Sequence, residues 1–221
     1  MKFANIVFDC DSTLSGIEGI DYLARGNSNY DLITAMTNKA MNNGSRIDYE
    51  ARLQLIDLYY DDLIRLAQVY YDNITPGAEQ VIRTLIELGK NCYVLSAGMN
   101  PAVEIFARRI GIATSNVFAV NLNFDVKGRF TAVKSGQCLT NINGKIQIIK
   151  EIAANGNTVM IGDGFNDLAV HGYADKVIGF GGWITRAKLV AKFDEFVYEN
   201  NFNELLPKIL TEDELSTISL Y

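Results

Sequence analysis

Residues 3–13 read Phe3-Ala4-Asn5-Ile6-Val7-Phe8-Asp9-Cys10-Asp11-Ser12-Thr13, a nearly continuous apolar run that leads into two aspartates. The pattern is typical of a parallel strand that is covered on both faces, because a strand with one wet face would alternate. In open α/β sheets, ligands bind beyond the carboxyl ends of such strands. We therefore expect a buried strand that delivers Asp9 and Asp11 to a site at the edge of a parallel sheet.

Similar short apolar runs recur along the chain. They are Cys92–Leu95, Val117–Val120, Val159–Ile161 and Val177–Gly179. Segments with apolar residues at helical spacing lie between most of them, and these are Gly77–Leu88, Ala102–Arg109 (behind Pro101), Ile146–Ala154 and Phe165–His171. This alternation predicts an α/β fold with a doubly wound parallel sheet and right-handed connections.

Residues 16–73 depart from this rhythm, because they contain helical patterns and no strand-like run. The expected helices are Ile20–Arg25, Tyr30–Met41, Ile47–Leu58 and Asp61–Tyr70. The tripeptide Thr75-Pro76-Gly77 suits a return into the sheet. We expect a core of residues 1–15 and 75–221 and a helical cap of residues 16–74. A β-hairpin is expected within residues 121–133, turning at Asp125–Gly128.

The composition is that of an ordinary globular protein. The 221 residues are 48% hydrophobic with a formal net charge of −6, which argues against a nucleic-acid partner, since basic residues do not cluster. The N-terminus does not resemble a signal peptide, and no apolar stretch is long enough to span a membrane. Three cysteines without CxxC spacing favour free thiols, and we expect a cytoplasmic protein that is a monomer or a homodimer.

Asp9 and Asp11 are the first chemical feature. In an extended segment, side chains two residues apart point to the same side, so the two carboxylates need a cation or a shared proton between them. Mg²⁺ is a hard cation that prefers oxygen ligands and also recruits phosphate. The plainer interpretation is an aspartate-rich turn in which Ser12 or Thr13 caps a helix.

Three further features follow other expected strands. Ser96-Ala97-Gly98 offers a hydroxyl and backbone N–H groups to an anion, Lys145 brings a cation to a helix start, and Gly162-Asp163-Gly164-Phe165-Asn166-Asp167 offers two more carboxylates. Each has an ordinary alternative. Taken alone, they could be a strand–helix turn, a solvated surface lysine and a capped helix start.

The four features together are far more specific. In the chain order D-x-D-x-T, S-x-G, K, G-D-G-x-N-D, they resemble the haloacid dehalogenase superfamily of phosphotransferases across nearly the whole chain. Within it, the flanking residues are most similar to the phosphoserine phosphatase family. That finer likeness is carried by Asp11–Leu14, Glu18–Asp21, Met36-Thr37, Ala40-Met41, Arg52-Leu53, Thr75–Gly77 and Gly179–Gly182.

The resemblance implies a Mg²⁺-dependent phosphomonoester hydrolase that works through an aspartyl-phosphate. Asp9 would be the nucleophile, and Asp11 would act as general acid and base. Asp9, the backbone carbonyl of Asp11 and Asp163 would hold Mg²⁺, with Asp167 steadying the metal's water shell. The phosphate would contact Ser96, Lys145 and the N–H groups of Ala97 and Gly98, with Asn166 as a further substrate contact.

The resemblance also implies a substrate, free L-phosphoserine. Glu18 would accept from its ammonium, and Arg52 would bind its carboxylate bidentately. In the ordinary alternative, Glu18 is a solvated acid and Arg52 pairs with surface acids. The sequence departs from the family at Ser96-Ala97-Gly98-Met99, where a second glycine and Phe are usual, and at Ile47 or Tyr49, where the cap usually offers Phe. Other small phosphoesters, such as phosphothreonine or phosphoethanolamine, are the alternative substrates.

Two other classes of protein fit less well. A phospho-accepting signalling receiver is also doubly wound, but it is about half this length, lacks a helical insert and carries its acidic pair and acceptor on separate strands. A non-catalytic binding protein would be favoured by loss of either Asp9 or Asp11, and both are present. Tyr59-Tyr60 and Tyr70-Tyr71 are expected to pack within the cap rather than at a ligand.

Overall fold

The fold is built on one parallel sheet. The computed structural model describes residues 2–43 and 48–218 and places six strands in the order β3-β2-β1-β6-β7-β8. The strands are β1 (Asn5–Phe8), β2 (Asn91–Met99), β3 (Val117–Val120), β6 (Thr158–Gly162), β7 (Lys176–Phe180) and β8 (Glu195–Val197). Every pairing in this sheet is parallel, so the predicted doubly wound α/β fold is confirmed.

The strand order reverses between β1 and β6, because β2 and β3 are added on one side of β1 and β6, β7 and β8 on the other. In sheets of this kind, ligands bind at such a switch point. Phe8, the last residue of β1, is in register with Val94 of β2 on one side and Ile161 of β6 on the other. Ile6, Val7 and Phe8 are fully buried, as expected for a central strand covered on both faces. This register brings the carboxyl ends of the three central strands to one edge.

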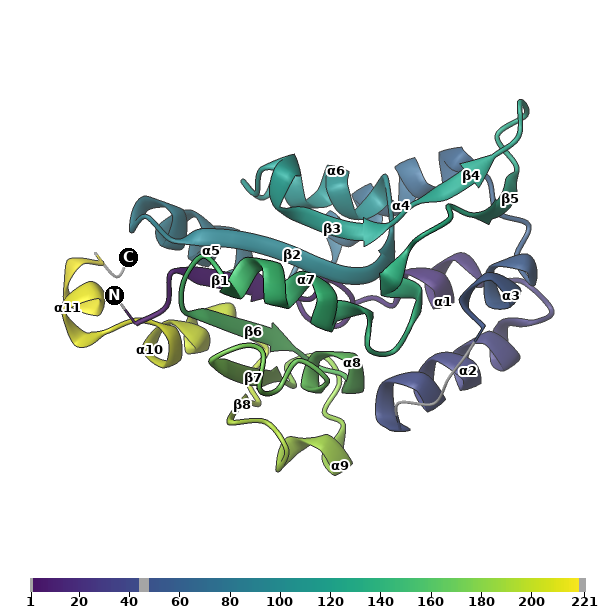
Figure 1. The fold of residues 1–221 in the computed structure, drawn as a ribbon. Coiled ribbons are helices and arrows are strands. Elements are labelled where there is room, and N and C mark those ends of the chain that lie inside the picture. The colour runs from purple at the N-terminus through teal and green to yellow at the C-terminus, as the bar shows by residue number, and fades with distance from the viewer. Residues whose placement is uncertain (1, 44–47, 219–221) are drawn as a thin grey trace.

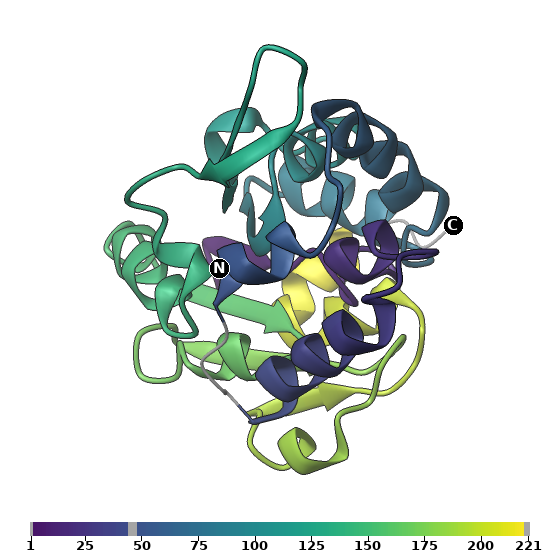
Figure 2. The same ribbon diagram turned by 90° about the vertical axis from the view of Figure 1, so that its right-hand side faces the viewer.

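Helices flank the sheet and also extend beyond its carboxyl edge (Figures 1 and 2). The helices of the sheet region are α5 (Ala78–Glu87), α6 (Ala102–Arg109), α7 (Gly144–Ala153), α8 (Phe165–Leu168), α9 (Ala187–Val190), α10 (Leu206–Ile209) and α11 (Glu212–Thr217). Those of the insert are α1 (Gly19–Leu23), α2 (Tyr30–Asn43), α3 (Tyr49–Gln54) and α4 (Tyr60–Asp72). None of the described helices is long and apolar enough to cross a membrane.

The described part of residues 16–73 contributes no strand to the sheet, and α1, α2 and α3 lie beyond its carboxyl end in Figure 1. The two chain segments that join the insert to the sheet run side by side. The Gly16 N–H donates to the Asn73 carbonyl at 2.9 Å, and the Thr75 N–H donates to the Leu14 carbonyl at 2.9 Å. We propose on this basis a core of residues 1–15 and 75–221 and a cap of residues 16–74.

The hairpin is formed by β4 (Leu122–Phe124) and β5 (Phe130–Val133), with Gly128 at a φ of 78° in its turn. It reaches over to the cap. The Phe130 N–H donates to the Leu58 carbonyl at 2.9 Å, and the Tyr60 N–H donates to the Gly128 carbonyl at 2.8 Å. The predicted helix Ile47–Leu58 is therefore wrong at its end: α3 stops at Gln54, and the chain before α4 pairs with the hairpin instead. Ile47 lies outside the described residues.

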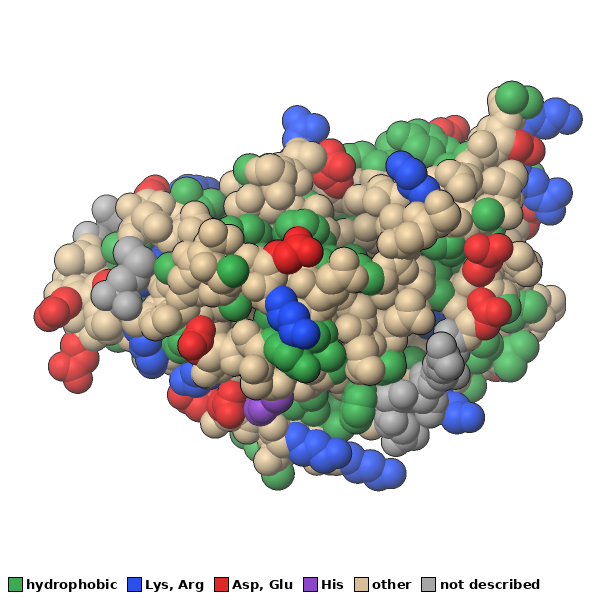
Figure 3. Space-filling view, in the orientation of Figure 1, with side chains coloured by type: hydrophobic (Ala, Val, Ile, Leu, Met, Phe, Trp, Pro, Cys, Tyr) green, Lys and Arg blue, Asp and Glu red, His purple; other side chains and the backbone are tan. Residues whose placement is uncertain are grey.

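Other boundaries also differ from the predictions. β2 runs on to Met99, so Ser96–Gly98 form the end of the strand rather than a loop after it. The helix expected over Phe165–His171 ends at Leu168. β8 is not among the predicted strands, because three residues at the edge of a sheet carry too little apolar pattern. His171 is exposed at the surface, where acidic and basic side chains are interspersed (Figure 3).

Candidate active site

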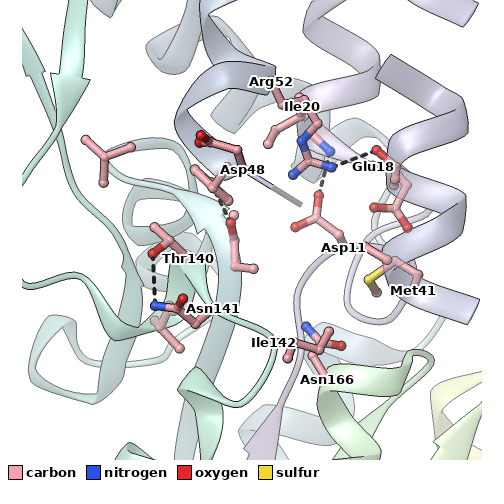
Figure 4. A pocket seen from close by; sticks show the side chains of 18 of the residues that line it. Asp11, Glu18, Ile20, Met41, Asp48, Arg52, Thr140, Asn141, Ile142 and Asn166 are labelled. Carbon is pink, nitrogen blue, oxygen red and sulfur yellow. Dashed lines mark hydrogen bonds between the residues drawn. The ribbon is translucent and has the colours of Figure 1, made fainter. Parts of the chain in front are cut away.

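Seven of the predicted site residues line one cavity between the carboxyl edge of the sheet and the cap. Its volume is about 550 Å³. Of the residues predicted for the site, it is lined by Asp9, Asp11, Glu18, Arg52, Ala97, Gly98 and Asn166. In Figure 4, Arg52 and Glu18 lie on one side of Asp11 and Asn166 on the other. Ser96, Lys145, Asp163 and Asp167 are buried beside or behind this lining.

Lys145 lies in the first turn of α7 and is 2% exposed, so it is not a solvated surface lysine. Its Nζ donates to Asp9 Oδ1 at 2.7 Å and to Asp167 Oδ1 at 2.6 Å. Burial disfavours the ammonium form, but the two carboxylates outweigh this and raise the pKa of Lys145 above its usual value. The raised pKa favours the ammonium form of Lys145, which lies against the expected nucleophile, Asp9.

Replacing Lys145 with Met is expected to lower the free energy of unfolding by about 3–5 kcal/mol, because two buried carboxylates would lose their shared cation. Urea unfolding followed by circular dichroism measures this. The exposed Lys150 on the same helix provides the control, since its replacement with Met should cost less than about 1 kcal/mol. Equal losses in the two variants would contradict the ion-pair account.

Asp11 is held between the sheet and the cap. Its Oδ1 accepts from the Gly19 N–H at 2.5 Å and from the Tyr70 hydroxyl at 2.9 Å, and its Oδ2 accepts from the Ser96 hydroxyl at 3.3 Å. Burial raises the pKa of Asp11, and the Gly19 and Tyr70 hydrogen bonds oppose that rise. A carboxyl group with a raised pKa that faces the cavity suits a general acid.

Asp163 follows β6 and faces Arg186, which is 4% exposed. Arg186 Nε donates to Asp163 Oδ2 at 2.9 Å, and its NH2 group lies 3.2 Å from Glu18 Oε1. Burial raises the pKa of Asp163 to about 7 against the opposing effect of the Arg186 guanidinium. Arg186 therefore joins an expected metal ligand to the expected ammonium acceptor, Glu18, which also accepts from the Ser12 hydroxyl at 2.9 Å.

The acidic side chains fit a hard divalent cation. One carboxylate oxygen from each of Asp9, Asp163 and Asp167 lies within 4.8 Å of the others, and all three residues are buried. Asp163 Oδ1 is buried with no hydrogen-bond partner among the described residues, which leaves a ligand atom available. Both oxygens of Asp167 are used, since Oδ2 accepts from the Gly164 N–H at 2.9 Å and Oδ1 from Lys145. Such an aspartate is better suited to support than to direct ligation.

The Ser96-Ala97-Gly98 segment is only partly arranged as expected for binding phosphate. The Gly98 N–H donates to the Ser96 hydroxyl at 2.9 Å, so it is engaged within the segment rather than free for an anion. The Ala97 carbonyl accepts from the Tyr49 hydroxyl of α3 at 2.7 Å, which ties the cap to the end of β2. A Cβ on Gly98 would lie 2.8 Å from the Val103 side chain and 2.9 Å from Asp11 Oδ2. A larger residue at this position would therefore have to displace the Val103 or Asp11 side chain.

Two buried residues of the site are absent from the predicted set. Tyr70 is expected only to pack within the cap, but its hydroxyl contacts Asp11 while its ring stacks on Phe106 of α6 at 5.6 Å. Arg186 lies in the loop after β7, beyond the last recognised motif. An isolated arginine or tyrosine gives no periodic signal, so only the fold reveals either contact. Near Arg186, the feature singled out in the sequence is the Gly181-Gly182 pair, which belongs to the resemblance but does not itself indicate a role for the arginine.

Comparison with known proteins agrees with this geometry. Residues 6–170 match the haloacid dehalogenase-like hydrolase family. The chain belongs to this family. A phosphoserine phosphatase of Bos taurus is 33% identical over 208 residues, which cover 91% of each chain. The chain is therefore an enzyme of the phosphoric monoester hydrolase class.

Two solved structures are also similar to this chain. One is described as a substrate-bound phosphoserine phosphatase complex; it has a TM-score of 0.82 and 28% identity, and the match covers 95% of this chain and 100% of that one. The other, described as a phospho-aspartyl intermediate analogue of phosphoserine phosphatase, has a TM-score of 0.81, the same identity and the same coverage. These similarities extend over the cap as well as the sheet.

Proposed function

We propose that the protein is a Mg²⁺-dependent phosphatase that hydrolyses O-phospho-L-serine to L-serine and phosphate. The observation that carries this proposal is the placement of Glu18 and Arg52, one acidic and one basic side chain, in the same cavity as Asp9 and Asp11. Phosphoserine presents an ammonium and a carboxylate beside its phosphate. A site that offers one group of each sign is therefore complementary to it.

Asp9, Asp163 and the backbone carbonyl of Asp11 would hold the metal, with Asp167 as a supporting group. When bound, Mg²⁺ would offset the negative charge that phosphate brings to these aspartates and would polarise the phosphoryl group. Asp163 Oδ1, which has no hydrogen-bond partner in the described part of the chain, supports this assignment. Lys145 and Ser96 would bind phosphate oxygens, because both lie within hydrogen-bond distance of an aspartate of the first motif.

In the proposed reaction, the Asp9 carboxylate attacks phosphorus, and the bond from phosphorus to the serine oxygen breaks. Asp11 donates its proton to that oxygen as it leaves. It then accepts a proton from the water that attacks the aspartyl-phosphate, which releases phosphate and restores Asp9. Gly19 and Tyr70, which both belong to the proposed cap, donate the hydrogen bonds that hold the Asp11 carboxyl group in place. Closure of the cap over the sheet would therefore complete the site.

Replacing Arg52 with Ala is expected to raise KM for L-phosphoserine by about 10- to 100-fold, because the substrate carboxylate would lose its charged partner. Hydrolysis of p-nitrophenyl phosphate, which has no carboxylate, should change by less than about threefold. Arg65, exposed on α4, provides the matched control: its replacement with Ala should leave both substrates unaffected. Equal losses on both substrates in the Arg52 variant would mean that Arg52 supports the fold rather than the substrate.

Chelation by EDTA is expected to abolish phosphatase activity, and added Mg²⁺ should restore it. An Asp163→Asn variant should need at least about tenfold more Mg²⁺, both for activity and for the Mg²⁺-dependent rise in the unfolding temperature. Asp48 lies at the same cavity but is exposed, so Asp48→Asn should keep the wild-type Mg²⁺ dependence. An Asp163 variant with unchanged Mg²⁺ dependence would remove Asp163 from the ligand set.

A panel of small phosphoesters tests the substrate assignment. L-phosphoserine, phosphothreonine, phosphoethanolamine and sugar phosphates should be compared by kcat/KM in the presence of Mg²⁺. The proposal predicts that L-phosphoserine is preferred over phosphoethanolamine, because only the former offers a carboxylate to Arg52. A higher kcat/KM for a phosphoester without a carboxylate would contradict it.

A further inference from the structure

Arg52, which lines the cavity, is held in place by hydrogen bonds within the cap. Its NH1 group donates to Thr37 Oγ1 at 2.8 Å, and the Thr37 hydroxyl donates to Asp21 Oδ1 at 2.5 Å. Arg52 lies on α3, Thr37 on α2 and Asp21 on α1, so the three residues join three helices of the cap. Thr37 is 5% exposed, which places its hydroxyl out of bulk water.

The direction of this chain of hydrogen bonds is fixed by chemistry. A guanidinium only donates, an ionised carboxylate only accepts, and a hydroxyl carries one proton. Thr37 can therefore accept from Arg52 and at the same time donate to Asp21. The alternative acceptor for the Thr37 proton, the Ile33 carbonyl at 3.2 Å, is farther away and uncharged. Asp21 thus places a negative charge close to Arg52, with the Thr37 hydroxyl between the two.

The arrangement leaves another part of the guanidinium available to a ligand. Arg52 lines the cavity, and among the described residues its guanidinium makes one hydrogen bond, from NH1 to Thr37. The Tyr49 ring, centred 5.5 Å from the guanidinium carbon, restrains the group from another direction. The guanidinium is therefore held by Thr37 at NH1, and the part of it that lines the cavity is available to a carboxylate.

We propose that Thr37 and Asp21 are positioning residues that orient Arg52 for the substrate carboxylate and so determine selectivity for phosphorylated amino acids over phosphorylated amines. This inference rests on the proposed function, because it concerns how the same site recognises its substrate. A guanidinium that is already held in place loses less conformational freedom on binding a carboxylate than the guanidinium of a freely moving arginine side chain does. Loss of the Arg52–Thr37–Asp21 hydrogen bonds should therefore weaken binding of the substrate carboxylate without affecting hydrolysis of the phosphoester.

The experiment compares L-phosphoserine with phosphoethanolamine, which differs by the carboxylate alone. Thr37→Val keeps the shape of the side chain but removes the hydroxyl that links Arg52 to Asp21. Asp21→Asn keeps an acceptor oxygen but removes the charge. Each is expected to raise KM for L-phosphoserine about tenfold while changing kcat/KM for phosphoethanolamine by less than about twofold. Thr84→Val, the same change on α5 of the sheet region, should alter neither substrate.

A double-mutant cycle separates positioning from a purely structural role. Arg52→Ala combined with Thr37→Val should lose no more activity on L-phosphoserine than Arg52→Ala alone, because the Thr37 hydroxyl acts only through Arg52. Unfolding temperatures and turnover of p-nitrophenyl phosphate report whether each variant is folded. Additive losses in the double variant, or equal losses on both substrates in the single variants, would overturn the inference.

The same data distinguish the failure of this inference from failure of the proposed function. If the wild-type enzyme prefers L-phosphoserine and the Thr37 and Asp21 variants retain that preference in full, the positioning role is overturned and the proposed function stands. If the wild-type enzyme shows no preference for L-phosphoserine over phosphoethanolamine, both are overturned. A preference that is present in the wild type and reduced in both variants supports both.

Discussion

Replacing Asp9 with Asn is expected to lower kcat for L-phosphoserine by about 10⁴-fold or more, because the amide is a far weaker nucleophile than the carboxylate and no intermediate would form. Asp9 is 2% exposed, faces the cavity and is the carboxylate nearest the end of β1. Steady-state assays with Mg²⁺, run at high enzyme concentration, measure the loss.

The fold should survive this substitution. The amide would keep the shape of the aspartate side chain, and Lys145 would still pair with Asp167. Circular dichroism and the unfolding midpoint should therefore resemble those of the wild type, and L-serine or phosphate should still bind. A folded Asp9→Asn protein with near-normal turnover would show that Asp9 is not the nucleophile.

Replacing Asp11 with Asn is expected to reduce kcat for L-phosphoserine by about 10²–10⁴-fold, the usual contribution of a positioned general acid. The serine alkoxide is a poor leaving group, so its departure depends on a proton from Asp11. The amide can still accept from Gly19 and Tyr70, which keeps the cap contacts available.

The leaving group provides the internal control for Asp11. A nitrophenolate needs little protonation, so the first step with p-nitrophenyl phosphate should be much less impaired than with L-phosphoserine. Rapid-quench measurement of p-nitrophenol release isolates that step from hydrolysis of the intermediate. Equal slowing of this step for both substrates would contradict a proton-donor role and assign Asp11 to the architecture of the site.

Much of the fold follows from the sequence because its signals are local and repeated. The apolar runs after Phe3 and around Val159 coincide with buried strands, and Ala102–Arg109 coincides with α6. The register of β1 with β2 and β6 then accounts for the meeting of Asp9, Ser96 and Asp163 at one edge. Motif order along the chain is informative here because parallel strands all end at the same edge.

Contacts that depend on packing between the cap and the sheet leave no such signal. The early end of α3 reflects hydrogen bonds with a hairpin far along the chain, and helical propensity cannot anticipate them. The apolar pattern of the helix around Tyr70 would be the same whether the Tyr70 hydroxyl faced solvent or bonded to Asp11. Arg186 pairs with Asp163 and Glu18 across long sequence separations, so its role follows only from their placement in space.

Transfer of the phosphoryl group from substrate to Asp9 is the central claim, and rapid acid quenching of the enzyme with ³²P-labelled L-phosphoserine and Mg²⁺ tests it most directly. The account predicts that label appears on the protein within one turnover, maps by mass spectrometry to the peptide containing Asp9, and disappears as free phosphate forms. The Asp9→Asn variant should take up no label. Phosphate release from L-phosphoserine at the full rate with no labelled protein, or with label on a peptide that lacks Asp9, would contradict the account.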